Sequence, residues 1–382
     1  MFLVVFLNII IHGCFIGSRV VMALFALELG ANAFEIGFMV ALYSLPPLGL
    51  GIVAGLVTDR YGVRPPMLFG AALSGIGLML PYVRPQLGTL YASAAVIGTA
   101  FVFYNVAVQN LAGAFGPREE RAQNFSTLSL GYSVSSFAGP MVAGYAIDLL
   151  SYRAAYLCFS VSTLVPFLVV LFDRQLRRVA LPRAAPGSRN FLELLRLPEL
   201  RKVLITGAMV STGWDLYMFY LPLYGHAIGM HATLIGIVLG VFAAATFIVR
   251  FALPRFTRRY GGGRVLSVAM YCGAATFVLF PFIKEVWLLA TLSFAIGLAL
   301  GCGQPLTLLL CYNRSPAGRT GEVTGIRLSL NHATHSTVPI VAGGLGAAFG
   351  TAPVFFMIAA VLVLSGYLSS TVKRVSAGAP PV

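Results

Sequence analysis

Long apolar stretches and short polar loops alternate along almost the whole chain. A helix needs roughly 20 apolar residues to cross about 30 Å of hydrocarbon, and it satisfies its backbone hydrogen bonds internally. The apolar stretches reach this length, so each predicts a transmembrane helix. Twelve spans are expected, at 2–25, 35–57, 65–83, 88–114, 123–147, 153–172, 201–224, 232–254, 265–283, 286–311, 323–347 and 351–371.

The one long polar segment runs from Asp173 to Lys202, between the sixth and seventh spans. It is rich in arginine and contains Pro182 and Pro186, which do not fit a continuous helix. We therefore expect an amino-terminal six-helix bundle at 1–173, a cytoplasmic linker at 174–200 and a carboxy-terminal six-helix bundle at 201–382. Within the linker, residues 191–200 have helical spacing and are expected to lie as a helix on the membrane surface.

Three short sequence matches link the two expected bundles. TDRYGVR at 58–64 returns as TRRYGGGR at 257–264, LSL at 128–130 returns at 328–330, and PMVAG at 140–144 returns as PIVAG at 339–343. The matches keep their order and nearly the same spacing, which indicates a duplicated chain. The sequence therefore predicts an all-α membrane protein whose twelve transmembrane helices form two pseudo-symmetric six-helix bundles, a layout common in secondary transporters.

Composition and charge support a membrane-embedded chain with one orientation. The chain is 58% hydrophobic and only 10% charged, which is too apolar for a soluble protein. Most of its 26 Lys and Arg residues lie in loops after even-numbered spans, whereas the opposite loops hold Arg84, Arg153 and Lys284. Because basic loops stay in the cytoplasm, both termini are expected there. This asymmetry and anionic lipid head groups explain the net charge of +14 without a nucleic-acid partner.

The loop after the second span resembles the signature of a known transporter family. Its pattern resembles GxxxDRxGRR of the major facilitator superfamily, except that proline stands at the last position. The resemblance covers the whole chain and implies two six-helix bundles that rock around a central site. It also implies that the matching residues form a conformational latch, in which the acidic side chain caps a helix or pairs with an arginine. These residues are Gly55, Asp59, Arg60, Gly62 and Arg64.

The fifth span resembles an element of the antiporter branch of this superfamily. Gly131, Gly139, Pro140 and Gly144 look like its GPxxGG element, with alanine in place of one glycine. The pattern is closest to the bacterial drug/proton antiporters, and this resemblance implies export. The fourth span departs from the branch, because it lacks the arginine that drug/proton antiporters commonly carry there.

Two charged residues lie well inside expected spans, where a charge is costly and marks a functional position. They are Arg19 in the first span and Asp215 in the seventh. The resemblance implies that helices 1, 4, 7 and 10 line the cavity, so both side chains would face it. We expect Asp215 to carry the coupling proton, with Arg19 as its ion-pair partner or as the anchor for an anionic group. A permanent structural pair is the alternative.

Polar and aromatic side chains at helical spacing predict further site residues. His12 and His335 could relay protons, because imidazole exchanges protons near neutral pH. A mixed aromatic and amide lining suits a small, partly apolar organic molecule. The expected cavity residues are Asn8, Phe15, Tyr104, Asn105, Gln109, Ser211, Trp214, Gln304, Asn331 and Thr334. Arg327 lies near an inner span end, and we expect it to snorkel to the cytoplasmic surface.

These observations favour a secondary active transporter that expels a small organic compound in exchange for protons by alternating access. An uptake symporter or uniporter on the same fold stays open, as does a sensor that keeps the fold without transporting. The sequence lacks a GxxxxGK[ST] phosphate loop and the HExxH and GxSxG motifs, and its five cysteines lack metal-site spacing. We therefore expect no enzyme activity, cofactor or metal. We expect a monomer in a bacterial inner membrane, with a small-molecule substrate, protons and lipid as its partners.

Overall fold

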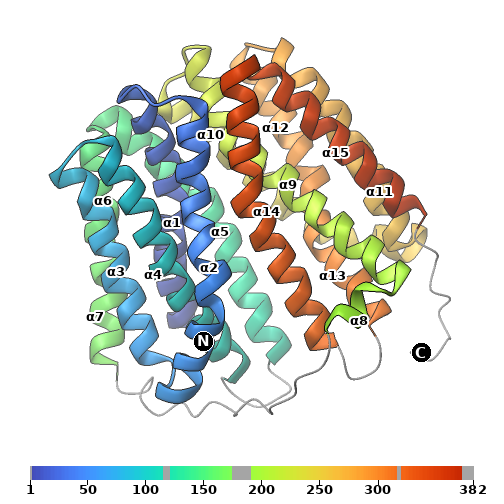
Figure 1. Ribbon diagram of the computed structural model, residues 1–382, viewed down its shortest axis with the longest axis horizontal. Coiled ribbons are helices and arrows are strands. Elements are labelled where there is room, and N and C mark those ends of the chain that lie inside the picture. Colours follow the sequence, from blue (N-terminus) through green and yellow to red (C-terminus); the bar gives the residue numbers. More distant parts are fainter. Residues whose placement is uncertain (1, 115–120, 174–190, 316–319, 372–382) are drawn as a thin grey trace. The chain divides into compact units, whose positions relative to one another are not determined.

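The computed structural model describes residues 2–114, 121–173, 191–315 and 320–371 (Figure 1). Within these ranges the chain forms helices and no strand. It divides into two compact units: unit 1 holds Met1–Pro186 and Pro222–Gly240, and unit 2 holds Gly187–Leu221 and Val241–Val382. Because residues 222–240 belong to unit 1, the units do not follow the chain order, and the bundle boundaries expected at 173 and 201 stay a prediction.

Every expected span coincides with one long helix or with consecutive shorter ones. The first six are α1 (Phe2–Glu28), α2 (Ala33–Tyr61), α3 (Arg64–Val83), α4 (Leu87–Ala114), α5 (Arg121–Leu149), and α6 (Tyr152–Ser162) with α7 (Leu164–Phe172). The last six are α9 (Pro198–Ala227), α10 (Ala232–Tyr260), α11 (Gly262–Leu279) with the 3-10 helix η2 (Phe280–Phe282), α12 (Val286–Gly301) with α13 (Gly303–Arg314), α14 (Thr320–Phe349) and α15 (Ala352–Ser370). The all-helical, multi-pass fold is confirmed.

Three long helices differ from the rest in polarity. Nine segments of the described residues are long and apolar enough to cross a membrane, and α5, α9 and α14 are not among them. Their lengths of 29, 30 and 30 residues suffice for a span, so polar side chains within them lower their apolar character. Polar groups inside a membrane helix turn toward the protein interior, because lipid does not solvate them. These three helices carry most of the polar contacts described below.

Prolines explain where helices break. Pro166 has no N–H to bond the carbonyl of Ser162, and α6 ends at that residue. Pro305 likewise leaves the carbonyl of Gly301 without its helical partner, and α12 ends there. The continuous helix expected at 191–200 is wrong: α8 (Phe191–Leu195) is followed by a turn, and Pro198 starts α9, as a proline at the first helical position can.

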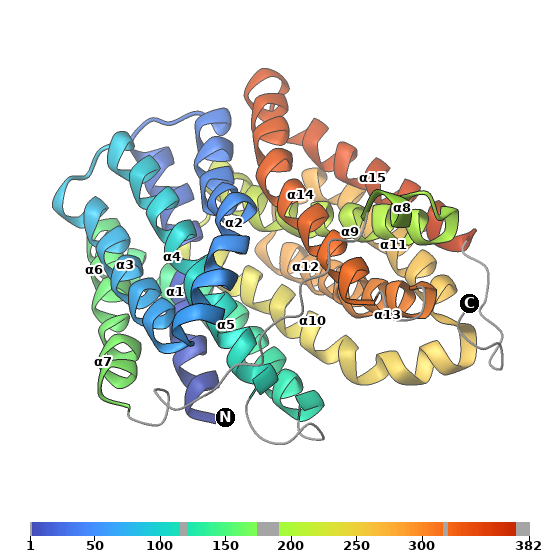
Figure 2. The same cartoon turned by 60° about the horizontal axis from the view of Figure 1, so that its bottom comes forward.

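Each unit has its own packed interior. In unit 1, α3 packs against α4 and α6, and α1 packs against α5 (Figure 2). Leu7, Met67 and Leu111 belong to a buried core cluster there. In unit 2, α11 packs against α12 and α15, and the rings of Phe280 and Phe355 stack with centroids 5.1 Å apart. These interiors hold the polar side chains of α1, α5, α9 and α14 in place.

Candidate functional site

The side chains of Asp215 and His335 are in direct contact in unit 2. The Oδ2 atom of Asp215 on α9 meets the Nδ1 atom of His335 on α14. The carboxylate side chain is 2% exposed, whereas the imidazole side chain is 28% exposed. A carboxylate this deeply buried depends on its partner, because losing the partner would leave an uncompensated charge. The imidazole is the more exposed partner, and the ring centroid of His332 lies 6.2 Å from that of His335.

A chain of hydrogen bonds lies one helical turn from this pair. Arg327 donates from Nη1 to Oε1 of Gln304 at 2.8 Å. Gln304 donates from Nε2 to the Ser211 hydroxyl at 3.0 Å, and Ser211 donates to Oδ1 of Asn331 at 3.1 Å. We call these four residues the Arg327 network. Ser211 precedes Asp215 on α9 by four residues, and Asn331 precedes His335 on α14 by four residues. Each helix therefore carries two polar side chains on one face, one turn apart.

Arg327 was expected to extend to the cytoplasmic surface, but it turns inward instead. The residue is 9% exposed, and it donates its hydrogen bond to Gln304 on α13. A buried guanidinium requires acceptors, so Gln304 supplies the polar environment that water would otherwise provide. The Arg327 network therefore joins a buried cation to the neighbourhood of a buried carboxylate.

The other two expected cavity residues of unit 2 make local contacts. Trp214 packs edge-on against Phe242, with ring centroids 4.8 Å apart. Thr334 bonds the carbonyl of Asn331 in its own helix at 2.8 Å. Both are partly exposed, and their role in a cavity stays a prediction.

An aromatic cluster occupies the facing surfaces of α1, α2, α4 and α5 in unit 1. Phe15 stacks on Phe101 with centroids 4.0 Å apart, and its other neighbour Tyr43 lies edge-on at 5.6 Å. His12 lies 5.6 Å from Phe101 and 4.9 Å from Tyr132. We call these five residues the aromatic cluster. It combines large apolar ring surface with a few polar edges, as organic ligand sites do.

Hydrogen bonds hold the polar edges of this cluster. His12 meets the Ser135 hydroxyl through Nδ1 at 2.5 Å, and the Tyr132 hydroxyl donates to Oδ1 of Asn105. Of the other expected lining residues, Asn8 is fully buried and Gln109 is exposed. These contacts bring together the polar faces that were expected on α1 and α4.

Tyr104 lies elsewhere in unit 1. Its side chain is fully buried in the core cluster with Met67, Ala71 and Ala107. A Cβ atom added to Gly70 of α3 would meet the Tyr104 Cβ at 2.8 Å, so Tyr104 packs directly against the backbone of α3. We therefore leave Tyr104 out of the proposed cavity.

Arg19 is partly buried one turn along α1 from Phe15. Among the described residues of unit 1, no hydrogen bond or ion pair involves its guanidinium. The preceding residue, Ser18, accepts a hydrogen bond of 3.3 Å from the Tyr43 hydroxyl, which ties this turn of α1 to the aromatic cluster. The ion pair of Arg19 with Asp215 stays a prediction.

The latch-like residues lie where α2 ends and α3 begins. Gly55 and Arg60 belong to α2, and Arg60 is exposed. Gly62 closes the helix with φ at +82°, a conformation that favours glycine. Asp59 also belongs to α2, but its side chain lies outside the described part of the structure.

Arg64 makes the clearest contact of the latch-like residues. Its Nε atom donates to the Val170 carbonyl at 3.0 Å, and its Nη2 atom donates to the Leu171 carbonyl. These carbonyls belong to the last turn of α7, where no helical N–H remains to bond them. Arg64 therefore closes the end of α7 within unit 1. A role in latching one conformation stays a prediction.

The antiporter-like element of α5 makes close backbone contacts. A Cβ on Gly139 would lie 2.7 Å from the Gly13 carbonyl oxygen of α1, and a Cβ on Gly144 would collide with the backbone of Ala232. The Pro140 carbonyl lies against Gly236 of α10. Gly131 instead faces a side chain, since its Cβ would lie 2.8 Å from Cγ1 of Val5. The small residues of α5 thus let α1 and α10 approach closely.

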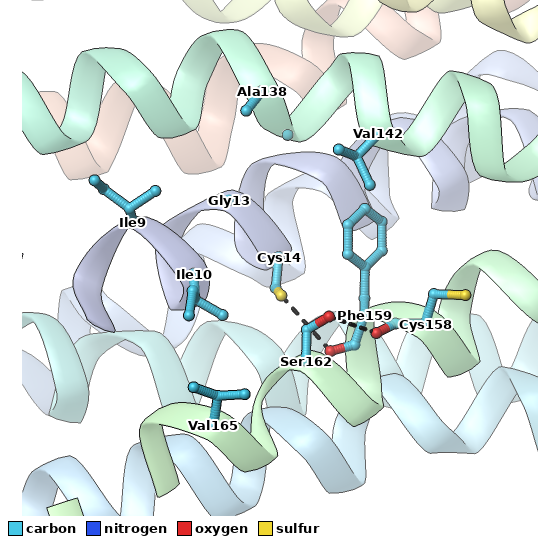
Figure 3. Close-up of a pocket in the computed structure, with 11 residues that line it drawn as sticks. Ile9, Ile10, Gly13, Cys14, Ala138, Val142, Cys158, Phe159, Ser162 and Val165 are labelled. Carbon is cyan, nitrogen blue, oxygen red and sulfur yellow. Dashed lines mark hydrogen bonds between the residues drawn. The ribbon is translucent and has the colours of Figure 1, made fainter. Parts of the chain in front are cut away.

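An apolar cleft of about 300 Å³ lies between α1, α5, α6 and α7 (Figure 3). Two of its polar side groups are already engaged: the Cys14 thiol donates to the Phe159 carbonyl at 3.6 Å, and the Ser162 hydroxyl donates to the Cys158 carbonyl at 2.7 Å. The cleft therefore offers ring and aliphatic surface without a charged side chain among its lining residues. The cleft therefore differs in chemistry from the aromatic cluster, which has polar edges.

Three residues that hold the site together are not among those expected from the sequence to form it. Tyr132 and Ser135 of α5 hold Asn105 and His12, and Arg327 anchors the network on α14. Tyr132 and Ser135 are three residues apart, which places them on one helix face. This spacing is the feature of the sequence by which they could have been identified. A pattern identifies such a face but does not identify the side chains opposite it.

Comparison with known proteins agrees with this architecture. The family model of the Major Facilitator Superfamily matches residues 1–336. The tetracycline resistance protein, class C, of Escherichia coli is 25% identical over 329 residues, which cover 83% of this chain and 81% of that protein. The multidrug resistance protein MdtG of Enterobacter lignolyticus is 24% identical over 339 residues, 86% of this chain and 80% of that protein.

Solved structures agree in fold. A mutant of the nucleoside transporter NupG superposes with a TM-score of 0.82 at 13% identity, covering 97% of this chain and 99% of that chain. A mutant of a peptide transporter POT in complex with sulfate gives a TM-score of 0.81 at 13% identity, covering 97% of this chain and 93% of that chain. The chain therefore belongs to the Major Facilitator Superfamily of membrane transporters.

Proposed function

We propose that the protein exports a small organic compound in exchange for protons, and that Asp215 and His335 carry the exchanged proton. The contact between these two side chains is the observation that carries the proposal. The names of the relatives, a tetracycline resistance protein and a multidrug resistance protein, support export of drug-like compounds. Uptake or uniport on the same fold would use the same helices in the opposite direction or without the proton.

The pair can hold a proton in more than one way. With one proton present, either the imidazole is charged beside a carboxylate or both groups are neutral, so the net charge of the pair is zero. A second proton neutralises the carboxylate beside a cation and removes the attraction that joins α9 to α14. Loss of the first proton leaves a buried negative charge. Each change alters the free energy of the contact between two helices, which is the property that a coupled carrier requires.

The Arg327 network lies next to the Asp215–His335 pair, toward the amino-terminal end of α14. Its hydrogen bonds all point the same way, from Arg327 through Gln304 and Ser211 to Asn331. A positive charge at one end aligns the dipoles of such a chain. We propose that this arrangement positions Ser211 and Asn331, and through them the turns of α9 and α14 that carry Asp215 and His335.

The proposed setting follows from the family and the charge distribution. We place the protein in a bacterial inner membrane as a monomer, with both termini in the cytoplasm. A carboxy-terminal fusion to green fluorescent protein, which fluoresces in the cytoplasm, and to alkaline phosphatase, which is active outside it, tests the orientation. Cross-linking in the membrane tests the monomer.

Proton movement in proteoliposomes tests the function. A fluorescent pH dye reports proton flux when tetracycline or an amphipathic drug is added to vesicles that hold a proton gradient. We expect compound-triggered flux in the wild type and none in Asp215→Asn, with Glu28→Gln as the control at the exposed end of α1. Equal flux in Asp215→Asn would reject the proton site. Movement of the compound in the direction opposite to export would favour uptake. Binding of the compound without any proton flux or transport would favour the sensor.

A further inference from the structure

Arg19 is a charged side chain inside unit 1 without a counter-charge among the described residues of that unit. Helical side chains lean toward the amino-terminal end of their helix, so Arg19 covers the turn of α1 that carries Phe15. His12, Phe15 and Arg19 follow one another at helical spacing on one face of α1, and the first two belong to the aromatic cluster. The cation and the rings therefore share a surface.

The described carboxylates near this surface are distant or already engaged. Glu28 is nine residues further along α1, roughly 13 Å at the rise of an α-helix. Glu35 accepts the N–H of Asn32 at 2.8 Å, and Asp148 accepts two backbone N–H groups of α10. Arg19 is also too far from the end of α1 for its side chain to reach the end of the helix.

We propose that Arg19 binds an anionic group of the transported compound, and that the aromatic part of the compound lies against the aromatic cluster. A guanidinium binds a carboxylate through two parallel hydrogen bonds, and this contact strengthens away from bulk water. The rings of Phe15, Phe101 and Tyr132 are each only partly buried, so they retain surface for a planar partner. The substrate class is therefore an aromatic anion. This inference rests on the proposed function, because it names what the transporter carries.

A set of three matched probes tests the charge preference. The probes are 2-naphthoate, its neutral amide 2-naphthamide and the cation 2-naphthylmethylammonium, and calorimetry measures their binding to the full chain in detergent. We expect 2-naphthoate to bind the wild type at least about tenfold more tightly than the amide, as a hydrogen-bonded charge pair predicts. Arg19→Gln should abolish this preference. Arg84→Gln, at an exposed loop position, should leave it unchanged.

Several outcomes would overturn the anion site. They are the absence of 2-naphthoate binding to the wild type, equal affinity for the three probes, tighter binding of the cation, and an unchanged preference in Arg19→Gln. If Arg19→Gln fails to elute as a folded monodisperse protein, Arg19→Lys decides, because it keeps the charge and loses the paired hydrogen bonds. It should weaken 2-naphthoate more than the amide. Equal weakening of both would also overturn the site.

The binding assay separates this inference from the proposed function, because it contains no proton gradient. A wild-type preference for 2-naphthoate together with proton flux that survives Asp215→Asn would reject the proton site and leave the anion site standing. Flux that requires Asp215, together with equal binding of all three probes, would reject the anion site and leave coupling standing.

Discussion

Asp148 at the end of α5 caps the first turn of α10, where its Oδ2 atom accepts the backbone N–H of Thr233 at 2.7 Å. Its Oδ1 atom accepts the N–H of Ala232 at 3.2 Å. These N–H groups have no partner within their own helix, and the negative charge suits the positive end of the helix dipole. Both residues belong to unit 1, so the cap joins segments of that unit that are far apart in the sequence.

Removing this cap should destabilise the protein. We expect Asp148→Ala to lower the free energy of unfolding by about 1 kcal/mol, as the loss of an N-cap side chain does. Asp148→Asn should cost less, since its amide oxygen can still accept a hydrogen bond. Thermal unfolding in detergent micelles measures both, with Glu28→Ala as the control. Identical stability of Asp148→Ala and the wild type would contradict a stabilising role of the cap.

The contact between α1 and α5 predicts a sharp difference between two glycines of the antiporter-like element. A Cβ on Gly139 would lie 2.7 Å from the backbone oxygen of Gly13 and 3.2 Å from the backbone nitrogen of Gly17, so the helices must separate. We expect Gly139→Ala to cost roughly 1–3 kcal/mol, the range for overpacking. Gly131→Ala should cost less, because its neighbour is the Val5 side chain. Equal melting temperatures of the two variants would count against backbone contact as the reason.

Gly62 and Gly55 offer a test of backbone conformation without crowding. A Cβ at either position would meet no atom within 4 Å, but only Gly62 has a positive φ, at +82°. We expect Gly62→Ala to cost roughly 1–3 kcal/mol, because its backbone (φ +82°, ψ 177°) lies in a region that is essentially restricted to glycine. Gly55→Ala, within α2, should be neutral or slightly stabilising. Thermal unfolding of the two single variants decides, and a neutral Gly62→Ala would show that the turn relaxes.

A double-mutant cycle tests the Arg327 network. Gln304→Met removes the acceptor of Arg327 and leaves a buried cation without it, so we expect a loss of about 2 kcal/mol or more. Arg327→Met alone should leave Gln304 with its hydrogen bond to Ser211. The double variant should be more stable than the sum of the single losses. Additive losses would show that the two side chains are not energetically coupled.

Several features of the fold follow from the distribution of apolar residues along the sequence. A span is required wherever an apolar stretch has the length of the bilayer, because lipid does not solvate a free backbone group. This explains why all twelve expected spans coincide with helices, whereas the breaks near Pro166 and Pro305 follow from the missing N–H of proline. Proline also explains why the continuous helix expected at 191–200 is wrong: the residues have helical spacing, but Pro198 starts a new helix.

The candidate site was only partly predictable. Helical spacing placed Asn8, His12, Phe15 and Arg19 on one face of α1, and the structure brings His12 and Phe15 into the aromatic cluster. The same reasoning put Tyr104 in the cavity, whereas it lies in the core cluster against α3. A face of α4 carries both kinds of position, and the local pattern of polar and apolar residues is similar at each.

The membrane-spanning helical architecture, the family signature and the few charges placed in costly positions can all be read from the amino-acid sequence. The partners of these charges become visible only in the folded chain: Asp215 meets His335, which is 120 residues away, and Arg327 turns inward to Gln304. The physical reason is that burial cost belongs to a single residue and its span, so a sequence reveals it. A contact depends on the rotation and register of two helices, which only the packing of the whole unit settles.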